Sequence, residues 1–371
     1  MEEMVAALGY ETTRAALTAV EGLLGRRVGA SVELGEPEDL GGSGRTLVMR
    51  VRVLHNNPLL PRSVVIKQLR AADHTDKDHS EAFAREGAAY KFATALPVDA
   101  RPGPQLLASD AEERILVLQD LGEGETMGDL LRRTPSSGAA TVLSAWAQAL
   151  GRMHAGTYGR ERDLSVLARR EHTDSRNDPV AGEAARAADA VPVALGGVDE
   201  ATRAVLDAAV ALFTEGPFRA FSPSDVGPDN THVVGGAVRF LDYEWAGFRD
   251  GALDVAYVLL TYPDCIEDGH DPDLDVAIVE AWRSEVVRLW PRLADDVALR
   301  RHVTTAKLAW LTLATYWALG LDSASRIDAG HLDSLPAWSN DDLAARWDRL
   351  AAADPRVHDF AVAAAAEVRA L

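Results

Sequence analysis

The chain has 371 residues, of which 47% are hydrophobic and 26% charged, a composition typical of a folded protein with a substantial core and room for two lobes. Its net charge of -19 argues against nucleic-acid binding, because contacts with phosphate groups require a basic surface. The sequence shows neither a signal peptide nor the roughly 20 apolar residues that a membrane helix needs, and its single cysteine, Cys265, cannot form an internal disulfide. We therefore expect a cytoplasmic protein without nucleic-acid or membrane partners.

The first 120 residues combine strand-like and helical patterns. Helices are predicted over 11–24 and 81–95, and the Val- and Leu-rich segments between and after them predict strands over 27–36, 46–54, 63–69 and 114–119. Beyond residue 121 the periodicity becomes helical. Helices are predicted over 126–133, 138–154, 199–214, 251–262, 275–290, 303–319, 340–352 and 357–370.

Two regions interrupt the helical series. Residues 231–242 predict a short β region, and residues 156–198 predict loops and short helices. The change of class near residue 120 predicts an α+β protein of two lobes, a small β-rich lobe at 1–120 and a larger, mostly helical lobe at 121–371, with a cleft between them.

Two ionisable residues of the first lobe fall on apolar faces. Lys67 shares one face of its strand with Val65 and Leu69, and Glu86 lies on the helical stripe that includes Tyr90. Because an unpaired buried charge is costly, we expect Lys67 and Glu86 to pair with each other. The alternatives are an edge-strand lysine that discourages aggregation and a solvated glutamate.

A glycine-rich segment separates the first two strands that follow the N-terminal helix, and it contains Gly41, Gly42, Ser43 and Gly44. Its backbone N–H groups could approach phosphate oxygens. The full GxGxxG pattern is absent, because residue 47 is leucine, so a plain hairpin loop is the alternative.

The strongest signal is the segment 221–247, in which the pair Gly235-Gly236 predicts a two-residue hairpin turn. The simplest register pairs Val234 with Ala237, His232 with Arg239 and Asn230 with Leu241. Asn230 and Asp242 then reach the same end of two strands, and a tight loop holds Asp225 nearby. Oxygen ligands without cysteine suit a hard cation such as Mg²⁺, and an acidic surface loop is the alternative.

Together these segments resemble the aminoglycoside phosphotransferase/choline kinase-like family, which has the protein-kinase-like fold. The resemblance runs in chain order from about residue 30 to residue 262. It rests on VVIK at 64–67, REGAAY at 85–90, LVLQDLG at 116–122, LGRMHA at 150–155, SDVGPDN at 224–230 and FLDYEWAG at 240–247. Asp254 also matches a family position, one that braces the catalytic loop.

The resemblance implies a kinase that uses ATP or GTP and Mg²⁺ to phosphorylate a hydroxyl of a small molecule. Lys67, held by Glu86, would contact the α- and β-phosphates, and Asp225 would orient the acceptor hydroxyl and take its proton. Asn230 and Asp242 would hold Mg²⁺, and these five side chains would converge in one cleft. Nucleotide contacts are implied for Gly41, Gly42, Ser43, Gly44, Lys67, Gln119 and Leu121, and backbone groups of the 118–121 connection would hydrogen-bond the adenine. The lobe at 1–120 would bind the nucleotide, and the lobe at 121–371 would bind the acceptor.

The acceptor itself is not evident from the sequence. The family suggests a small and possibly cationic molecule, such as an aminoglycoside-like antibiotic or an amino alcohol, and a monomer or homodimer. Acidic residues that could bind a cation are Glu244, Asp250, Asp264, Glu267, Asp268, Asp271 and Asp273, although a solvated acidic loop is the alternative for the last five. Trp310, Tyr316 and Trp317 predict core positions, one of which could wall the acceptor pocket. We expect His154 to be structural.

One departure from the family pattern opens other hypotheses. Pro223 and Ser224 precede Asp225, where the family has His-Gly. This favours, as an alternative, a catalytically degenerate pseudokinase that acts as a nucleotide-binding module. A third hypothesis is a metal-dependent phosphohydrolase, which would use the same acidic cluster without needing Lys67 or Glu86.

Overall fold

The computed structural model describes residues 2–42, 45–55, 57–70, 77–176, 178–321 and 338–371, without the side chains of 2–12 and 78. The chain forms two compact units. The first contains Met1–Ala95, Gly103–Glu123 and Val166–Asp174, and the second contains Leu96–Pro102, Gly124–Ser165 and Ser175–Leu371. The predicted α+β class, with a small antiparallel sheet and a mostly helical remainder, is confirmed. The lobe boundaries at 1–120 and 121–371 stay a prediction, since the two units interleave along the chain.

The first unit contains a five-stranded antiparallel sheet with the strand order β1-β2-β3-β5-β4. Its strands are β1 (Glu33–Gly41), β2 (Thr46–Leu54), β3 (Ser63–Leu69), β4 (Leu106–Asp110) and β5 (Ile115–Gln119). The sequence analysis missed β4, which is short and half polar and therefore carries little strand signal of its own.

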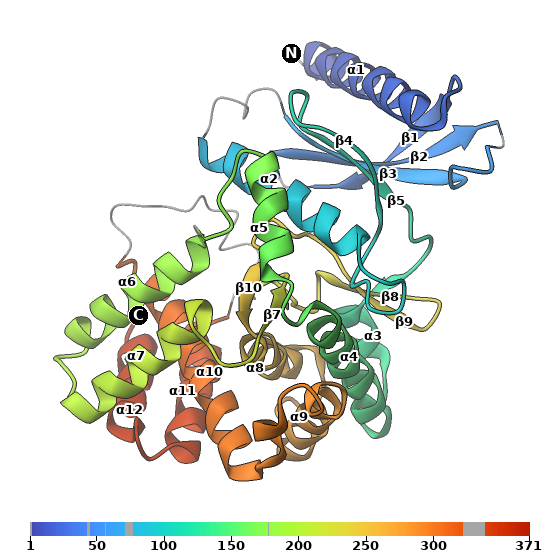
Figure 1. The fold of residues 1–371 in the computed structure, drawn as a ribbon. Coiled ribbons are helices and arrows are strands. Elements are labelled where there is room, and N and C mark those ends of the chain that lie inside the picture. Colours follow the sequence, from blue (N-terminus) through green and yellow to red (C-terminus); the bar gives the residue numbers. More distant parts are fainter. Residues whose placement is uncertain (1, 43–44, 56, 71–76, 177, 322–337) are drawn as a thin grey trace. The chain divides into compact units, whose positions relative to one another are not determined.

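Two helices of the first unit lie on opposite sides of this sheet (Figure 1). They are α1 (Glu2–Val28) and α2 (Lys77–Thr94). Val64 and Ile66 of β3 belong to the same buried cluster as Val20 and Leu24 of α1. Because side chains alternate along a strand, Lys67 points to the opposite face of the sheet.

The N-terminal helix runs further than expected. The sequence predicts a strand from residue 27, but α1 continues to Val28 and β1 begins at Glu33. The guanidinium of Arg27 donates a hydrogen bond to the carbonyl of Leu107 at 2.6 Å. Such a tertiary contact stabilises the last turn of the helix and is invisible to local propensity.

The second unit is mainly helical (Figure 1). Its helices include α3 (Met127–Arg133), α4 (Ser136–Thr157), α6 (Pro179–Ala194), α7 (Glu200–Thr214), α8 (Gly251–Thr261), α9 (Pro272–Val286), α10 (Asp296–Ala318), α11 (Asn340–Ala353) and α12 (His358–Arg369). α9 and α10 begin earlier than predicted, because Asp271 and Asp295 accept hydrogen bonds from the N–H groups of their first turns.

Residues 156–198 are more ordered than the sequence suggests. They contain α5 (Glu161–Arg170), which passes from the second unit to the first, and α6. Asp178 starts α6 by accepting hydrogen bonds from the N–H groups of Val180 and Ala181, and Pro179 occupies the first helical position. The expectation of loops and short helices is therefore wrong for α6.

Two small sheets lie within the second unit. One has the order β6-β8-β9, made of β6 (Glu125–Thr126), β8 (Thr231–Val234) and β9 (Ala237–Phe240). The other pairs β7 (Arg219–Ser222) with β10 (Gly247–Asp250) in antiparallel fashion. β7 and β10, which the sequence analysis did not predict, enclose the hairpin segment and place its two ends side by side.

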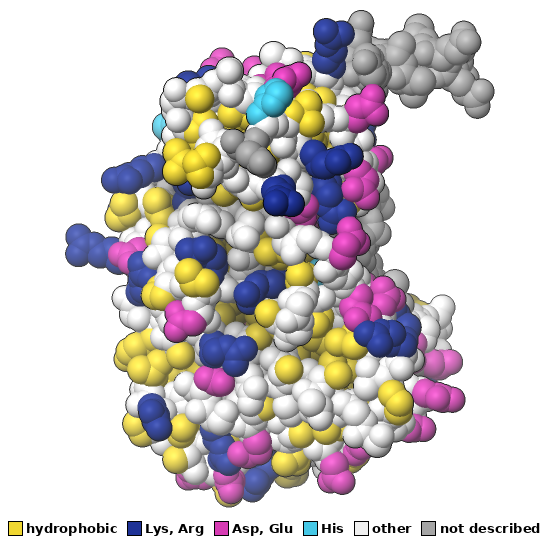
Figure 2. Space-filling model, turned by 90° about the vertical axis from the view of Figure 1, so that its right-hand side faces the viewer, with side chains coloured by type: hydrophobic (Ala, Val, Ile, Leu, Met, Phe, Trp, Pro, Cys, Tyr) yellow, Lys and Arg dark blue, Asp and Glu magenta, His cyan; other side chains and the backbone are white. Residues whose placement is uncertain are grey.

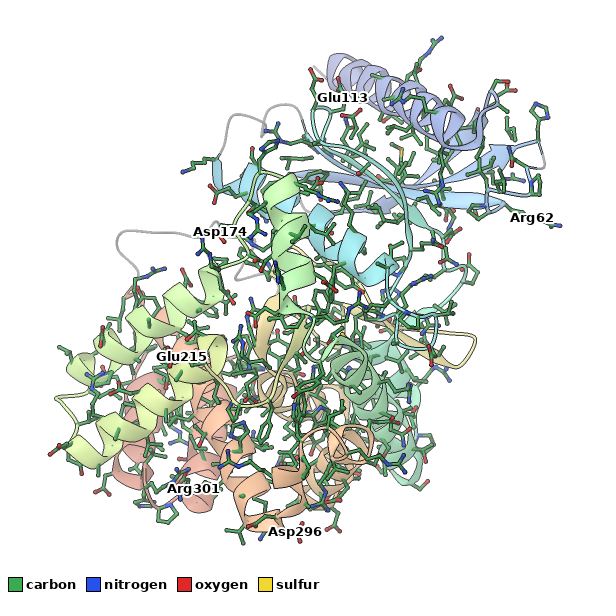
Figure 3. The ribbon with its side chains drawn as sticks, viewed as in Figure 1. Arg62, Glu113, Asp174, Glu215, Asp296 and Arg301 are labelled. Atoms are coloured by element: carbon green, nitrogen blue, oxygen red, sulfur yellow. The ribbon has the colours of Figure 1, made fainter. Side chains whose placement is uncertain are left out.

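Charged side chains occur both on the surface and in the interior of the protein. On the face shown in Figure 2, acidic and basic side chains are interspersed. Asp296 and Arg301 lie at the edge of the second unit, near the start of α10 (Figure 3). By contrast, Asp225, Arg249, Asp250 and Asp254 are buried. Within the described residues, no helix has the length and apolar character needed to cross a membrane.

Candidate functional site

The predicted site residues divide between the two units. Lys67 and Glu86 belong to the first unit, and Asp225, Asn230 and Asp242 belong to the second. Within each unit the predicted neighbours do come together, as the next paragraphs describe. That the two groups meet around one nucleotide remains a prediction.

In the first unit, Lys67 and Glu86 form the expected ion pair. The Nζ atom of Lys67 lies 2.8 Å from Oε1 of Glu86, and both residues are buried, with exposed fractions of 8% and 1%. β3 is the central strand of its sheet, so Lys67 is not an edge-strand guard, and Glu86 is not solvated. A buried ion pair stabilises a fold weakly at best, because desolvation offsets the Coulomb attraction. The pair is therefore weak evidence for stability, and the contact of Lys67 with nucleotide phosphates stays a prediction.

The described part of the glycine-rich segment is Gly41, the last residue of β1, and Gly42, which follows it. Gly41 and Gly42 adopt positive φ angles of 87° and 134°. A Cβ atom on Gly42 would lie 2.8 Å from the carbonyl oxygen of Thr46, so only glycine fits there. Ser43 and Gly44 lie outside the described residues, and phosphate binding by this segment stays a prediction.

The segment after β5 carries a feature that sequence reasoning missed. The carboxylate of Asp120 accepts hydrogen bonds from Oγ of Ser63 at 2.6 Å and from the N–H of Gly122 at 2.9 Å, and it lies 3.0 Å from Nε of Arg50. Burial by itself would raise the pKa of Asp120, but these hydrogen bonds and the charge of Arg50 leave it below its ordinary value. Asp120 is thus a charged anchor for this turn.

The two predicted base contacts in that segment differ in availability. The N–H of Gln119 already donates to the carbonyl of Gln105 at 2.8 Å, which removes this donor from the candidates. Among the described residues, no hydrogen bond occupies the N–H of Leu121. Leu121 is therefore the better placed of the two as a donor to a nucleotide base, although its role remains a prediction.

In the second unit, Asp225 is the centre of a buried hydrogen-bond network. Its Oδ2 accepts from Nδ2 of Asn230 at 2.6 Å, and its Oδ1 accepts from the N–H of Gly227 at 3.2 Å and from the hydroxyl of Tyr257 at 3.3 Å. Burial, with a further contribution from the charge of Asp242, raises the pKa of Asp225 to about 7, against the opposing effect of these donors. A carboxylate with this pKa can accept a proton near neutral pH.

The hairpin has the predicted register. Val234 pairs with Ala237 and His232 with Arg239, and the N–H of Leu241 donates to the carbonyl of Asn230 at 2.9 Å. This pairing carries Asn230 to Asp225 and brings the charge of Asp242 close enough to raise the pKa of Asp225. The predicted register and the proximity of Asn230 to Asp225 are thus confirmed, and the roles of Asp225, Asn230 and Asp242 stay predictions.

Two residues beside the network adopt the left-handed backbone conformation. Ser224 has a φ of 73° and Asp242 a φ of 56°. Non-glycine residues rarely adopt such angles, and the cost is tolerated mainly where the surrounding structure or the function requires it. Strain therefore lies next to the candidate base and at the candidate metal ligand.

Asn230 and Asp242 supply oxygen atoms only, which fits Mg²⁺. Among the described residues, no set of three His, Cys, Asp or Glu side chains is arranged to hold a metal ion alone. A magnesium ion at Asn230 and Asp242 would thus depend on phosphate and water oxygens for its remaining ligands, as Mg²⁺ usually does.

A chain of buried hydrogen bonds connects the segment before Asp225 to helices α4 and α8. Oδ1 of Asp254 accepts from Oγ of Ser222 at 2.7 Å, and Oδ2 lies 2.9 Å from Nε2 of His154. Nδ1 of His154 accepts from the indole N–H of Trp282 at 2.9 Å, which leaves the His154 proton on Nε2. Oγ of Ser222 also accepts from the N–H of Ser224 at 2.9 Å. His154 is fully buried and structural, as expected.

Several acidic residues proposed for the acceptor are engaged in the fold instead. Asp250 is fully buried, caps α8, and accepts a hydrogen bond from the N–H of Phe218 at 3.0 Å. Arg346 binds both oxygens of Asp264, at 2.6 and 2.7 Å. Asp271 caps α9. The expectation that these carboxylates are available to a cation is therefore corrected.

The aromatic residues of α10 are mostly core, as predicted. Trp310 and Tyr316 are buried, and the indole of Trp310 donates to the carbonyl of Leu253 at 2.9 Å. Trp310 packs edge-on against Tyr257, with ring centroids 5.0 Å apart, and so supports the residue whose hydroxyl reaches Asp225. Sequence reasoning missed Tyr257, because one tyrosine in an apolar helix gives no distinct signal.

No family model matches the chain, and no curated protein matches its sequence. Its structure is similar to the ethanolamine kinase of Plasmodium vivax, with a TM-score of 0.51 and 11% identity over 86% of this chain and 84% of that one. It is also similar to the choline kinase of Cryptosporidium parvum Iowa II, with a TM-score of 0.51 and 12% identity over 89% and 91% of the two chains. The chain has the protein-kinase-like fold.

This protein-kinase-like chain also aligns with a choline/ethanolamine kinase family protein of Mesorhizobium loti, at 16% identity and a TM-score of 0.46 over 89% of this chain and 92% of that one. At such identities the likeness shows the fold alone. The protein-kinase-like fold that the motif resemblance implies is confirmed, and the two neighbours at a TM-score of 0.51 are themselves an ethanolamine kinase and a choline kinase.

Proposed function

We propose that the protein is a small-molecule kinase that transfers the γ-phosphoryl group of ATP or GTP to a hydroxyl of its acceptor. The observation that carries the proposal is Asp225, a buried carboxylate whose pKa is raised to about 7 and whose two oxygens are oriented by Asn230, Gly227 and Tyr257. This geometry suits a group that receives the proton of an alcohol while remaining fixed in place.

In the proposed reaction, the acceptor hydroxyl attacks the γ-phosphorus and its proton passes to Asp225. The bond between the γ-phosphorus and the β–γ bridging oxygen breaks, and the nucleoside diphosphate leaves. Lys67, oriented by Glu86, would offset negative charge on the phosphates. Asn230 and Asp242 would hold Mg²⁺, which supplies further charge neutralisation when bound. Catalysis of this kind depends mainly on positioning.

The proposed acceptor is a small molecule with a hydroxyl group, either cationic or neutral. The net charge of -19 would attract a cationic acceptor, but solubility alone also accounts for it, and Asp250, Asp264 and Asp271 are already engaged within the fold. Choline, ethanolamine and aminoglycosides therefore belong in an acceptor screen, together with neutral alcohols and sugars. Small-molecule binding as a monomer or homodimer, without nucleic acid or membrane, completes the proposal.

The test is acceptor-dependent release of ADP or GDP in the presence of Mg²⁺, confirmed by mass spectrometry of the phosphorylated acceptor. Asp225→Asn should reduce the rate by about 10²–10⁴-fold. Asp359→Asn, at an exposed carboxylate of α12, is the matched control and should retain activity. Full activity of Asp225→Asn would refute the assignment of the base, and phosphate release without an acceptor would favour a phosphohydrolase.

A nucleotide-binding pseudokinase is the second candidate. Pro223 precedes the base, and Ser224 holds a left-handed conformation without being glycine. Such a module would be stabilised thermally by nucleotide and Mg²⁺ but would show no turnover with any acceptor.

A further inference from the structure

Arg249, on β10, is a buried arginine whose guanidinium contacts Asp178, Ser222 and Trp245. It is 1% exposed. Its Nε donates to Oδ2 of Asp178 at 2.7 Å and its Nη2 to Oδ1 at 2.9 Å, a two-pronged ion pair. Nη2 also donates to the carbonyl of Trp245 at 2.6 Å, and Nη1 lies 3.5 Å from Oγ of Ser222. One side chain therefore touches segments that are far apart in the sequence.

Asp178 is itself fixed in place. Its Oδ1 accepts hydrogen bonds from the N–H groups of Val180 and Ala181, at 3.0 and 3.2 Å, so that it caps α6 while it binds Arg249. The Asp178 carboxylate thus accepts four hydrogen bonds, and the Arg249 guanidinium donates four. A buried ion pair of this kind seldom stabilises more than an apolar pair of the same volume, but it does specify one geometry.

The segments that Arg249 joins are those that carry the proposed chemistry. β7 ends at Ser222, shortly before Asp225, and β10 begins at Gly247, shortly after Asp242. Ser222 and Gly247 are direct partners in the β7–β10 ladder. Beyond this last pair the ladder stops, and Pro223 has no N–H with which to extend it.

We infer that Arg249, anchored by Asp178, is a positioning residue that locks the segment of the base, 222–225, against the segment of the metal ligand, 242–247. Its catalytic consequence rests on the proposed kinase function, whereas its structural consequence does not. α6 lies in the region where the sequence predicts loops and short helices, and the N–H groups of its first turn fix the Asp178 carboxylate that binds Arg249.

Hydrogen exchange tests the structural part without requiring activity. In Arg249→Met, backbone amides in 222–226 and 242–247 should lose protection together. Arg346→Met is the matched control, because Arg346 is also buried, at 3% exposure, and also binds a carbonyl, that of Leu260, and a carboxylate, that of Asp264. It should lose comparable thermal stability but keep both segments protected. Equal protection of these segments in both variants would overturn the inference.

Kinetics test the catalytic part. Arg249→Met should lower kcat by about 10²-fold, the loss expected of a misplaced reacting group, while KM for the nucleotide changes by less than about threefold. Arg249→Lys, which keeps the charge but not the two-pronged geometry, and Asp178→Asn, which keeps the shape, should show smaller losses in the same direction. These milder variants also serve if Arg249→Met does not fold. Unchanged kcat in all of them would overturn the positioning role.

The two proposals fail in different ways. If the wild-type protein phosphorylates no acceptor, the proposed function is wrong, yet the exchange measurement still decides whether Arg249 locks the two segments. If the wild type is active and Arg249→Met loses no more activity than Arg346→Met, the positioning role is wrong and the kinase function stands.

Discussion

The amide of Asn230 donates a hydrogen bond to Oδ2 of Asp225 at 2.6 Å. This contact uses the Nδ2 end of Asn230, so its carbonyl oxygen is left facing away from the donor side, as a metal ligand requires. One residue therefore orients the proposed base and can still offer oxygen to Mg²⁺. The relationship exists because the hairpin turn at Gly235-Gly236 sets the register of β8 and β9.

The raised pKa of Asp225 predicts a pH-dependent rate. The base must be ionised to accept a proton, so activity should rise with pH through about 7 and then level off. The measurement is kcat/KM as a function of pH, because kcat/KM reports the ionisation of groups in the free enzyme, with the buffer ionic strength held constant. A rate that is flat from pH 5 to pH 8 would contradict the assignment.

The same shift predicts a stability effect. Because the folded pKa of Asp225 lies above the ordinary value of 3.8, the folded state binds more protons than the unfolded state between these values. The contribution of Asp225 to stability is thus present at low pH and is lost as the pH rises toward 7. As the pH rises from 4 to 8, we expect the Tm of Asp225→Asn to rise relative to the Tm of the wild type. Asp359→Asn should show no such trend.

Tyr257→Phe should shift the pH profile. The Tyr257 hydroxyl donates to Asp225 and so favours its ionised form. Its removal should move the midpoint of the rate profile to higher pH, with little effect on KM for the nucleotide. Tyr316→Phe, in the same helical unit, is the control. An unchanged midpoint in Tyr257→Phe would show that the 3.3 Å contact has no influence on the base.

The Lys67–Glu86 pair should show strong coupling. Lys67→Met removes the cation that lies 2.8 Å from the buried Glu86 carboxylate and should cost about 3–5 kcal/mol of unfolding free energy. The double variant Lys67→Met/Glu86→Leu should be more stable than Lys67→Met alone, since it buries no charge, yet it should be inactive. Denaturant unfolding of the wild type, both single variants and the double variant measures the coupling. If the losses of unfolding free energy in the two single variants add up to the loss in the double variant, the two side chains are not coupled.

Ser224→Gly should stabilise the protein. The left-handed conformation costs a non-glycine residue about 1–2 kcal/mol, partly offset by the greater freedom of glycine in the unfolded chain. We expect a net gain of up to about 1 kcal/mol with activity retained. Ser165→Gly, within α5, should instead destabilise by about 1 kcal/mol. Loss of stability in Ser224→Gly would indicate that the serine hydroxyl does more than accommodate the turn.

Local patterns in the sequence determined much of the candidate site. The alternation of β3 placed Lys67 on the face that meets Glu86, and the two-glycine turn determined which residues of β8 and β9 lie opposite each other. Both are predictable because strand alternation and turn geometry act over only a few residues.

Tertiary structure alone decided the supports of that site. Asp178 and Arg249 are separated by 71 positions, and Asp225 and Tyr257 by 32. No periodicity links such residues, because their contact depends on how complete helices and short strands pack. The strands β7 and β10 likewise have four residues each and exist only as a pair. Local sequence patterns thus identified the candidate reacting side chains, and long-range packing decided which residues hold those side chains in place.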